Sequence, residues 1–131
     1  MSLVKPLESC NQIQASGFKA VNRDFDHWGL NASQKMAILR LPKATFYKYT
    51  KTPDKINLDD DQMERLSYVL NIHASLRTVF TNRENIYGFI KMPNDNAFFN
   101  GRTPLSIIEK GSFSGLYEVS KQIDALRGAQ W

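Results

Sequence analysis

The sequence predicts an all-α protein, and three observations lead to this fold class. Apolar residues recur at helical spacing in nearly every segment that has a clear period. Capping and stop residues separate these segments. No two alternating runs are joined by a hairpin turn, so nothing in the sequence favours a sheet. With 131 residues, the chain can form one core of ordinary size or two small helical units packed together.

The N-terminal stretch, residues 1–15, is expected to be a flexible arm. It lacks the apolar region of a secretory signal, and it holds Cys10, the only cysteine of the chain, which therefore has no partner for an internal disulfide. No apolar run is long enough to span a bilayer. We therefore expect a cytoplasmic protein.

Three helices are expected between residues 16 and 51, the last two joined by a sharp corner. Gly29 ends the first of them, and Asn31 can cap the second together with Gln34, as in a capping box. Pro42 stands where the third can begin, because the first turn of a helix needs no N–H donor. The residues spaced for burial are Phe18, Val21, Phe25 and Trp28 in the first helix, and Met36, Leu39, Leu41 and Phe46 around the corner.

The third of these helices has a mostly cationic outer face, as a helix-turn-helix needs when its second helix enters a DNA groove. With Phe46 on the buried side, the lysines would bind phosphates, while Ala44 and Tyr47 could touch base edges. Thr45 could reach a phosphate or stay part of the packing. The candidate DNA-binding residues are Lys43, Ala44, Thr45, Tyr47, Lys48 and Lys51.

Two residues depart from the usual pattern of such a corner. Met36 stands where the close approach of the helices favours a small residue, and Arg40 stands where a positive φ favours glycine. Helical units of this shape are also common as plain packing units, so the sequence leaves both interpretations open.

Positive charge is concentrated in the first part of the chain. Residues 1–57 hold nine Lys/Arg and four Asp/Glu, residues 58–131 hold eight and nine, and the whole chain carries +4. Such asymmetry is typical of a module that meets a polyanion, attached to one that does not. Taken alone, it is better explained by a solvated basic face.

The aspartates at residues 59–61 are expected to begin the next helix, since acidic residues are stabilised at its N-terminus. A calcium loop starting there would need a glycine and an acid where Glu64 and Leu70 stand, so capping is the better explanation. Met63, Leu66 and Leu70 form the apolar stripe of this helix. Asn71 is expected to break it, with a separate helix carrying Leu76, Val79 and Phe80.

The rest of the chain alternates short helices with loops. A helix with Ile86, Phe89 and Ile90 is followed by the longest loop, Met92–Pro104. Thr103 can cap a helix that starts at Pro104 and stops at Gly111. The apolar residues of these last elements are Leu105, Ile108, Leu116, Val119, Ile123 and Leu126, and Gly128 ends the final helix.

The chemistry of an enzyme is absent from the sequence. His27 and His73 have no Cys or His at metal-ligand spacing, and neither a dinucleotide-binding glycine motif nor a P-loop is present. No serine stands in a nucleophile elbow. We therefore expect a protein that is not an enzyme and that holds no metal and no cofactor.

Five segments resemble the Xre/MbcA/ParS antitoxins, which are partners of RES-domain toxins in bacterial operons. They are L-P-K-A-T-F-Y-K-Y, L-D-D-D-Q-M-E-R-L-S-Y-V-L-N-I, L-R-T-V-F, N-G-R-T-P-L and I-D-A-L-R-G-A-Q-W. The most specific pair is Gly101–Leu105 with the ending Arg127, Gly128 and Trp131. Ser106 and Ala129 stand where the family often has an acid and a second glycine.

The resemblance implies a two-part protein. Residues 16–81 would be an Xre/Cro-like helix-turn-helix domain that binds operator DNA and represses the operon, and residues 82–131 a toxin-binding domain. The toxin would consume NAD, and the antitoxin, itself without activity, would block the toxin's active site, often as a homodimer. The candidate toxin-binding residues are Arg102, Arg127, Gly128 and Trp131.

Several alternatives stay open. Trp131 could fold back on the chain's own surface, and Arg102 could fix the loop before Thr103 instead of touching the toxin. The whole protein could also be a transcriptional regulator without a toxin partner. A third possibility is a toxin inhibitor whose altered corner has lost DNA binding.

Overall fold

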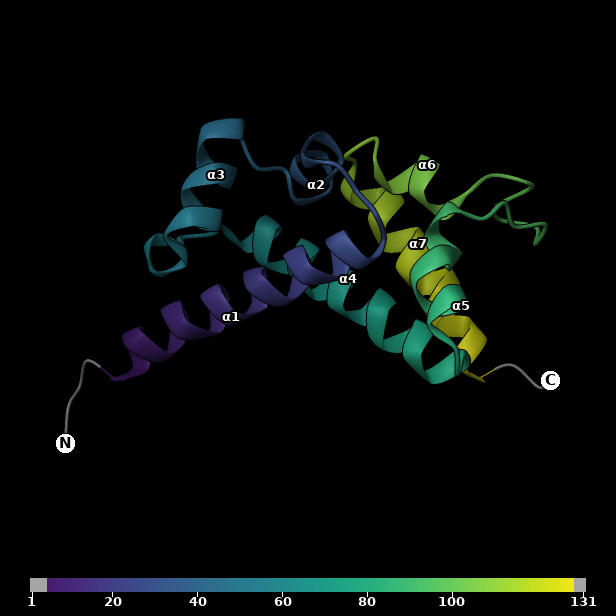
Figure 1. Cartoon of the computed structure of the whole chain (residues 1–131), viewed down its shortest axis with the longest axis horizontal. Helices are drawn as coiled ribbons and strands as arrows, with labels where there is room; N and C mark the ends of the chain where they lie inside the picture. The colour runs from purple at the N-terminus through teal and green to yellow at the C-terminus, as the bar shows by residue number, and fades with distance from the viewer. Residues whose placement is uncertain (1–4, 129–131) are drawn as a thin grey trace.

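The computed structural model describes residues 5–128, with side chains over residues 12–128, and this part of the chain is all-helical apart from turns and loops. Its α-helices are α1 (Lys5–His27), α2 (Ala32–Leu39), α3 (Lys43–Lys51), α4 (Asp60–Val79), α5 (Arg83–Gly88), α6 (Pro104–Ile108) and α7 (Phe113–Ala125). Three short 3-10 helices, η1 (Pro53–Lys55), η2 (Phe89–Lys91) and η3 (Leu126–Gly128), complete the described part. Figure 1 shows α3 toward one end, α5 and α7 toward the other, α2 near the middle, and α4 running between the two ends.

Helix α1 begins at Lys5, whereas a flexible arm was expected through residue 15. Residues 5–15 are therefore helical, and the last two residues of this stretch contact the rest of the fold. The Gln14 Oε1 accepts a hydrogen bond of 3.0 Å from the backbone N–H of Leu58, and Ala15 packs against the core. The predicted stripe is confirmed, since Phe18, Val21, Phe25 and Trp28 are buried. Gly29 follows the helix with φ +74°, as expected of a stop residue.

The expected corner between α2 and α3 is present. The Gln34 N–H donates to Asn31 Oδ1 at 2.8 Å, and the Asn31 N–H donates to Gln34 Oε1 at 2.9 Å, which confirms the capping box. Pro42 is the residue directly before α3. Of the predicted core residues here, Leu39, Leu41 and Phe46 are buried and Met36 is half-buried.

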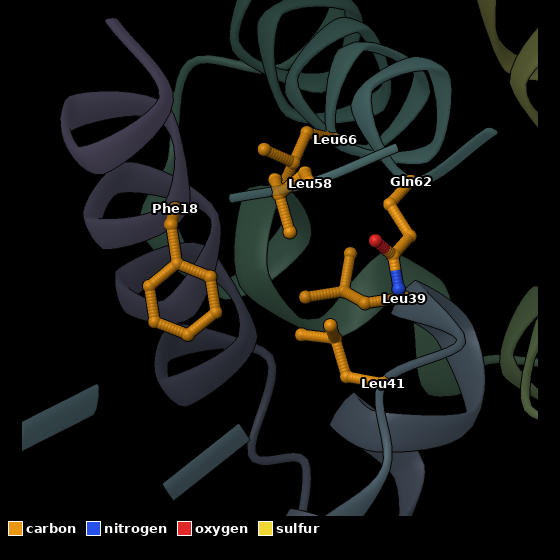
Figure 2. Close-up of a pocket in the computed structure, with 6 residues that line it drawn as sticks. All are labelled: Phe18, Leu39, Leu41, Leu58, Gln62 and Leu66. Atoms are coloured by element: carbon orange, nitrogen blue, oxygen red, sulfur yellow. The ribbon is translucent and has the colours of Figure 1, made fainter. Parts of the chain in front are cut away.

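The interior of the N-terminal unit is formed where α1, the corner and α4 meet. Figure 2 shows Phe18 of α1 facing Leu39 and Leu41 of the corner, with Leu66 of α4 close by. Gln62 reaches toward the corner in the same view, where its Nε2 donates to the Arg40 carbonyl at 2.9 Å. Apolar burial and one satisfied amide thus hold the corner against α4.

Helix α4 is continuous from Asp60 to Val79, so the predicted break at Asn71 is wrong. Asn71 faces α7, where its Nδ2 donates to Ser120 Oγ at 3.1 Å. Because Val69, Ile72 and Leu76 around it are fully buried, packing outweighs the weak helix propensity of asparagine. At the start of α4, Asp59 forms a capping box with Gln62, which confirms the capping interpretation of the aspartates.

The C-terminal helices pack on the second half of α4. Thr103 caps α6, since its Oγ1 accepts from the Ser106 N–H at 3.1 Å, and Leu105 and Ile108 are buried as predicted. Helix α7 carries Leu116, Val119 and Ile123 into the same core, while Leu126 is half-buried in η3. Gly111, with φ +85°, makes the turn between α6 and α7.

Two negative findings apply to the described residues. No helix within residues 5–128 combines the length and the apolar character needed to cross a membrane. Over the same residues, no three His, Cys, Asp or Glu side chains gather in a way that could hold a metal ion.

Candidate functional site

Helix α3 presents the predicted cationic face to solvent. Lys43, Ala44, Tyr47, Lys48 and Lys51 are exposed, with Tyr47 at 48%, whereas Thr45 is half-buried. The structure therefore brings together all six side chains proposed for DNA binding on one short helix. It contains no nucleic acid, so their contact with DNA stays a prediction.

The opposite side of α3 is held by two aromatic residues. Phe46 and Tyr49 are buried, and both rings meet Phe18 of α1 edge-on, at centroid distances of 6.0 and 6.2 Å. The Tyr49 hydroxyl also donates to the Asn57 carbonyl at 3.0 Å. Because these anchors fix the helix about its axis, the lysines on the other side have a defined direction.

The corner before α3 has the backbone conformation that the sequence pattern predicts. Arg40 lies in the left-handed region with φ 57° and ψ 47°, where glycine is the usual residue. Its guanidinium compensates by pairing with two carboxylates, Asp59 and Asp61, the Nε–Oδ2 distance to Asp61 being 2.6 Å. The backbone N–H of Gln62 and the Arg40 guanidinium hold the pKa of Asp59 below its usual value. The atypical arginine therefore leaves the corner intact.

One basic residue of this region does not belong to the exposed surface. Lys35 is buried against α1, where its Nζ pairs with Asp26 and donates to Asn22 Oδ1 at 2.9 Å. Its charge is paired with that of Asp26, whose side chain is itself mostly exposed. The cationic surface is thus carried by α3 itself and not by α2.

Arg102 acts within the loop that precedes α6. Its Nε donates to the Phe99 carbonyl at 2.9 Å, its Nη2 donates to the Phe98 carbonyl at 2.5 Å, and its guanidinium lies 5.5 Å from the Phe98 ring centroid. These contacts support the loop-fixing alternative. A contact of Arg102 with a toxin stays a prediction.

The other candidate toxin-binding residues lie at the end of α7. Arg127 is exposed in η3, with its Nη1 3.4 Å from Asp124 Oδ1, and Gly128 follows it, also exposed. Trp131 lies outside the described residues. The described part of this tail is therefore accessible and carries one cationic side chain on a short helical turn.

A second group of polar residues, which the sequence does not reveal, lies between α1, α4 and α5. Asp24 and His73 approach each other to 3.6 Å, and His27 stacks on Tyr87 with a centroid distance of 4.4 Å. They line a cleft of about 330 Å³. His27 and His73 are far apart along the chain, so their spacing does not predict that they lie close together. The sequence signal is the one-turn spacing of His27 from Arg23 and from Asp24 on α1.

Comparisons with known proteins agree with the expected organisation of the chain into a helix-turn-helix domain and a toxin-binding domain. Residues 12–71 match the model of the antitoxin Xre-like helix-turn-helix domain, and residues 75–129 match the model of the antitoxin Xre/MbcA/ParS C-terminal toxin-binding domain. An uncharacterized protein of Sinorhizobium fredii, y4oB, is 36% identical over 111 residues, which cover 84% of this chain and 83% of the relative. The two matches meet within α4, ahead of the boundary expected after residue 81.

Proposed function

Because the chain belongs to the Xre/MbcA/ParS antitoxin family, with its helix-turn-helix and toxin-binding domains, we propose that it neutralises a RES-domain toxin and represses its own operon. Neutralisation would occur by covering the toxin's NAD-binding site with the C-terminal domain. Repression would occur through binding of α3 to operator DNA. The chain would do both in the cytoplasm without any catalysis of its own.

The observation that carries this proposal is the presence of both domains in one chain. The two matched regions follow each other in sequence within α4. A plain regulator would need no toxin-binding domain. A toxin inhibitor that had lost DNA binding would not need the exposed lysines of α3. Both domains therefore favour the combined function over either alternative.

The contacts of α3 support DNA binding. Lys43, Lys48 and Lys51 are exposed on the side opposite the aromatic anchors, so phosphate contacts would cost little reorganisation of the fold. Ala44 and Tyr47 lie between these lysines and are the side chains available for base contacts. A homodimer would place two such helices on a symmetric operator, as is usual for helix-turn-helix proteins.

The end of α7 supports toxin binding. A cleft shaped for a dinucleotide must present cationic and polar groups, and an exposed helical end with free carbonyl groups can occupy such a cleft. Arg127 and Gly128 lie on that end, and Trp131, an aromatic residue type frequent in binding hot spots, follows in the sequence. We infer that residues 127–131 bind in the toxin's active-site cleft and block it.

The direct test is co-expression with the product of the adjacent reading frame, followed by co-purification and an assay of NAD consumption. The expected result is that the neighbouring protein arrests growth and consumes NAD alone, and that this chain restores growth and co-purifies with it. The double variant Lys43→Ala/Lys48→Ala is the matched control, since it should rescue growth as well as the wild type. A neighbouring protein that neither binds this chain nor is inhibited by it would contradict the proposal.

A further inference from the structure

The cleft between α1, α4 and α5 has an aromatic wall. Tyr87 of α5 lies parallel to His27 of α1, with 8° between the planes, and parallel to His73 of α4, with 4° between the planes at a centroid distance of 6.3 Å. Since the three rings come from three different helices, their contacts fix the relative position of these helices. The cleft of about 330 Å³ continues into a neighbouring one of about 400 Å³ that shares His73, Arg77 and Tyr87. Both volumes fall within the range typical of small-molecule sites.

The charged lining of the two clefts is mostly cationic. Arg23, Arg77 and Arg83 are all exposed at their rim. Within residues 12–128, none of these three guanidinium groups lies within ion-pair distance of a carboxylate. Every other arginine described here donates a hydrogen bond to a carboxylate or carbonyl oxygen. The arginines of this cleft therefore keep their donor groups available for an external anion.

Asp24 is the acid among the described residues that line the two clefts. Asp24 is 7% exposed, and burial raises the pKa of its carboxyl group to about 6, although Arg23, His27 and Arg77 act in the opposite direction. Burial also lowers the pKa of His73, and Arg77 and His27 act in the same direction. Near neutral pH, three guanidinium groups therefore face one carboxylate, and the cleft carries an excess of positive charge.

We propose that this cleft is a binding site for the phosphate group of a small phosphorylated ligand. The planar guanidinium groups of Arg23 and Arg77 face it from two different helices and can each donate two hydrogen bonds to phosphate oxygens. The exposed imidazole of His27 is a further donor in its wall. Arg83 of the neighbouring cleft can reach a second negative group on the same ligand.

The site lies where the two domains meet. Arg23 and His27 belong to α1, in the part matched by the helix-turn-helix model, and Tyr87 and Arg83 belong to α5, in the part matched by the toxin-binding model. A ligand bound here contacts both domains at once. By thermodynamic linkage, it stabilises the arrangement of the two domains in which it binds best.

The test is a titration of the full chain followed by NMR of the His27 and His73 ring protons, at constant ionic strength maintained with chloride. Inorganic phosphate, adenosine monophosphate and adenosine are the three ligands. Saturable shifts with both phosphate compounds and none with adenosine are expected. A much tighter binding of adenosine monophosphate would identify a nucleotide as the source of the phosphate, and equal binding would identify free phosphate.

Arg23→Gln and Arg77→Gln are each expected to weaken phosphate binding by about tenfold, since each removes charge-assisted hydrogen bonds. Lys110→Gln, which removes the same charge from an exposed turn after α6, is the matched control and should bind as the wild type does. Thermal unfolding in chloride shows whether each variant is folded, and Arg83→Gln replaces any that is not. Shifts that do not saturate, or an equal loss in Lys110→Gln, would overturn the proposal.

Discussion

Arg65 and Gly111 join the two domains, since the Arg65 Nη1 donates to the Gly111 carbonyl at 2.9 Å. The same nitrogen donates to the Ile38 carbonyl at the end of α2 at 3.1 Å, and the Arg65 Nε donates to Asp61 Oδ2 at 2.9 Å. Arg65 is only 4% exposed. A Cβ at Gly111 would lie 3.1 Å from the Ala37 carbonyl oxygen, so glycine permits the close approach of the α6–α7 turn to α2.

Replacing Arg65 by methionine is expected to destabilise the fold strongly. The substitution preserves apolar volume but leaves the carbonyl groups of Ile38 and Gly111 without a donor. The expected loss is about 3 kcal/mol in the free energy of unfolding, measured by urea denaturation. Arg77→Met on the exposed side of α4 is the matched control and should cost less than about 1 kcal/mol. Equal losses in the two variants would show that Arg65 does not join the domains.

Because Arg40 has a left-handed conformation, glycine and alanine at this position should differ in their effect on thermal stability. Both substitutions remove the ion pairs with Asp59 and Asp61, but glycine also removes the strain of a positive φ. Arg40→Gly should therefore melt several degrees higher than Arg40→Ala in a thermal unfolding experiment. Identical melting temperatures would mean that the corner does not hold this conformation in solution.

Asp24 should make the stability of the protein fall as pH rises. Burial raises its pKa to about 6 from the ordinary value of 3.8, so the folded state binds more protons than the unfolded state between these two values. The free energy of unfolding contributed by this group is therefore highest below the lower value and declines up to the higher one. Above that window the ionised, buried carboxylate is a constant cost.

Asp24→Asn removes this titration. We expect the variant to be more stable than the wild type by on the order of 2 kcal/mol near neutral pH, with the difference vanishing near pH ~4. His73, whose pKa is lowered, adds stability that is lost as pH falls below its ordinary value. Because its Nε2 lies 3.6 Å from Asp24 Oδ1, the difference between the two proteins includes the coupling of these two groups. Urea denaturation at a series of pH values measures the stability difference between the variant and the wild type. Asp95→Asn, at an exposed position, is the control. A difference that does not change with pH would contradict the assignment.

The exposed lysines of α3 should set the salt dependence of operator binding. Lys43→Ala/Lys48→Ala is expected to reduce the slope of log affinity against log salt by roughly two phosphate contacts. Lys110→Ala/Lys121→Ala removes the same charge from exposed positions outside α3 and should leave the slope nearly unchanged. An unchanged slope in the α3 variant would remove this helix as the DNA-contacting element.

Much of the fold could be predicted because it depends on residues close together in the chain. The capping box at Asn31, the acidic helix start at residues 59–61, the stop at Gly29 and the cap at Thr103 each follow from neighbours within one helical turn. The direction of α3 followed in the same way, from the spacing of Phe46 relative to the lysines. These features are local, so one sequence is sufficient to find them.

The remaining features depend on distant partners. Asn71 stays in α4 because its neighbours are buried and its side chain meets Ser120 of α7, and Gln14 of α1 accepts its hydrogen bond from Leu58, 44 residues away. His27 and His73 meet only because Tyr87 of a third helix lies beside both. The hydrogen bonds by which Arg102 holds its loop depend on where the fold positions the carbonyl groups of that loop. Rules based on residue spacing do not predict contacts between distant parts of the chain.

The most direct test of toxin neutralisation is inhibition of the purified toxin's NAD consumption, titrated with the full chain and with a chain that lacks Gly128–Trp131. The full chain should inhibit completely at a stoichiometric ratio. The shortened chain should inhibit far less, while its affinity for operator DNA and its melting temperature stay unchanged. Inhibition by the shortened chain at the same ratio as by the full chain would contradict the claim that the C-terminal end covers the toxin's active site.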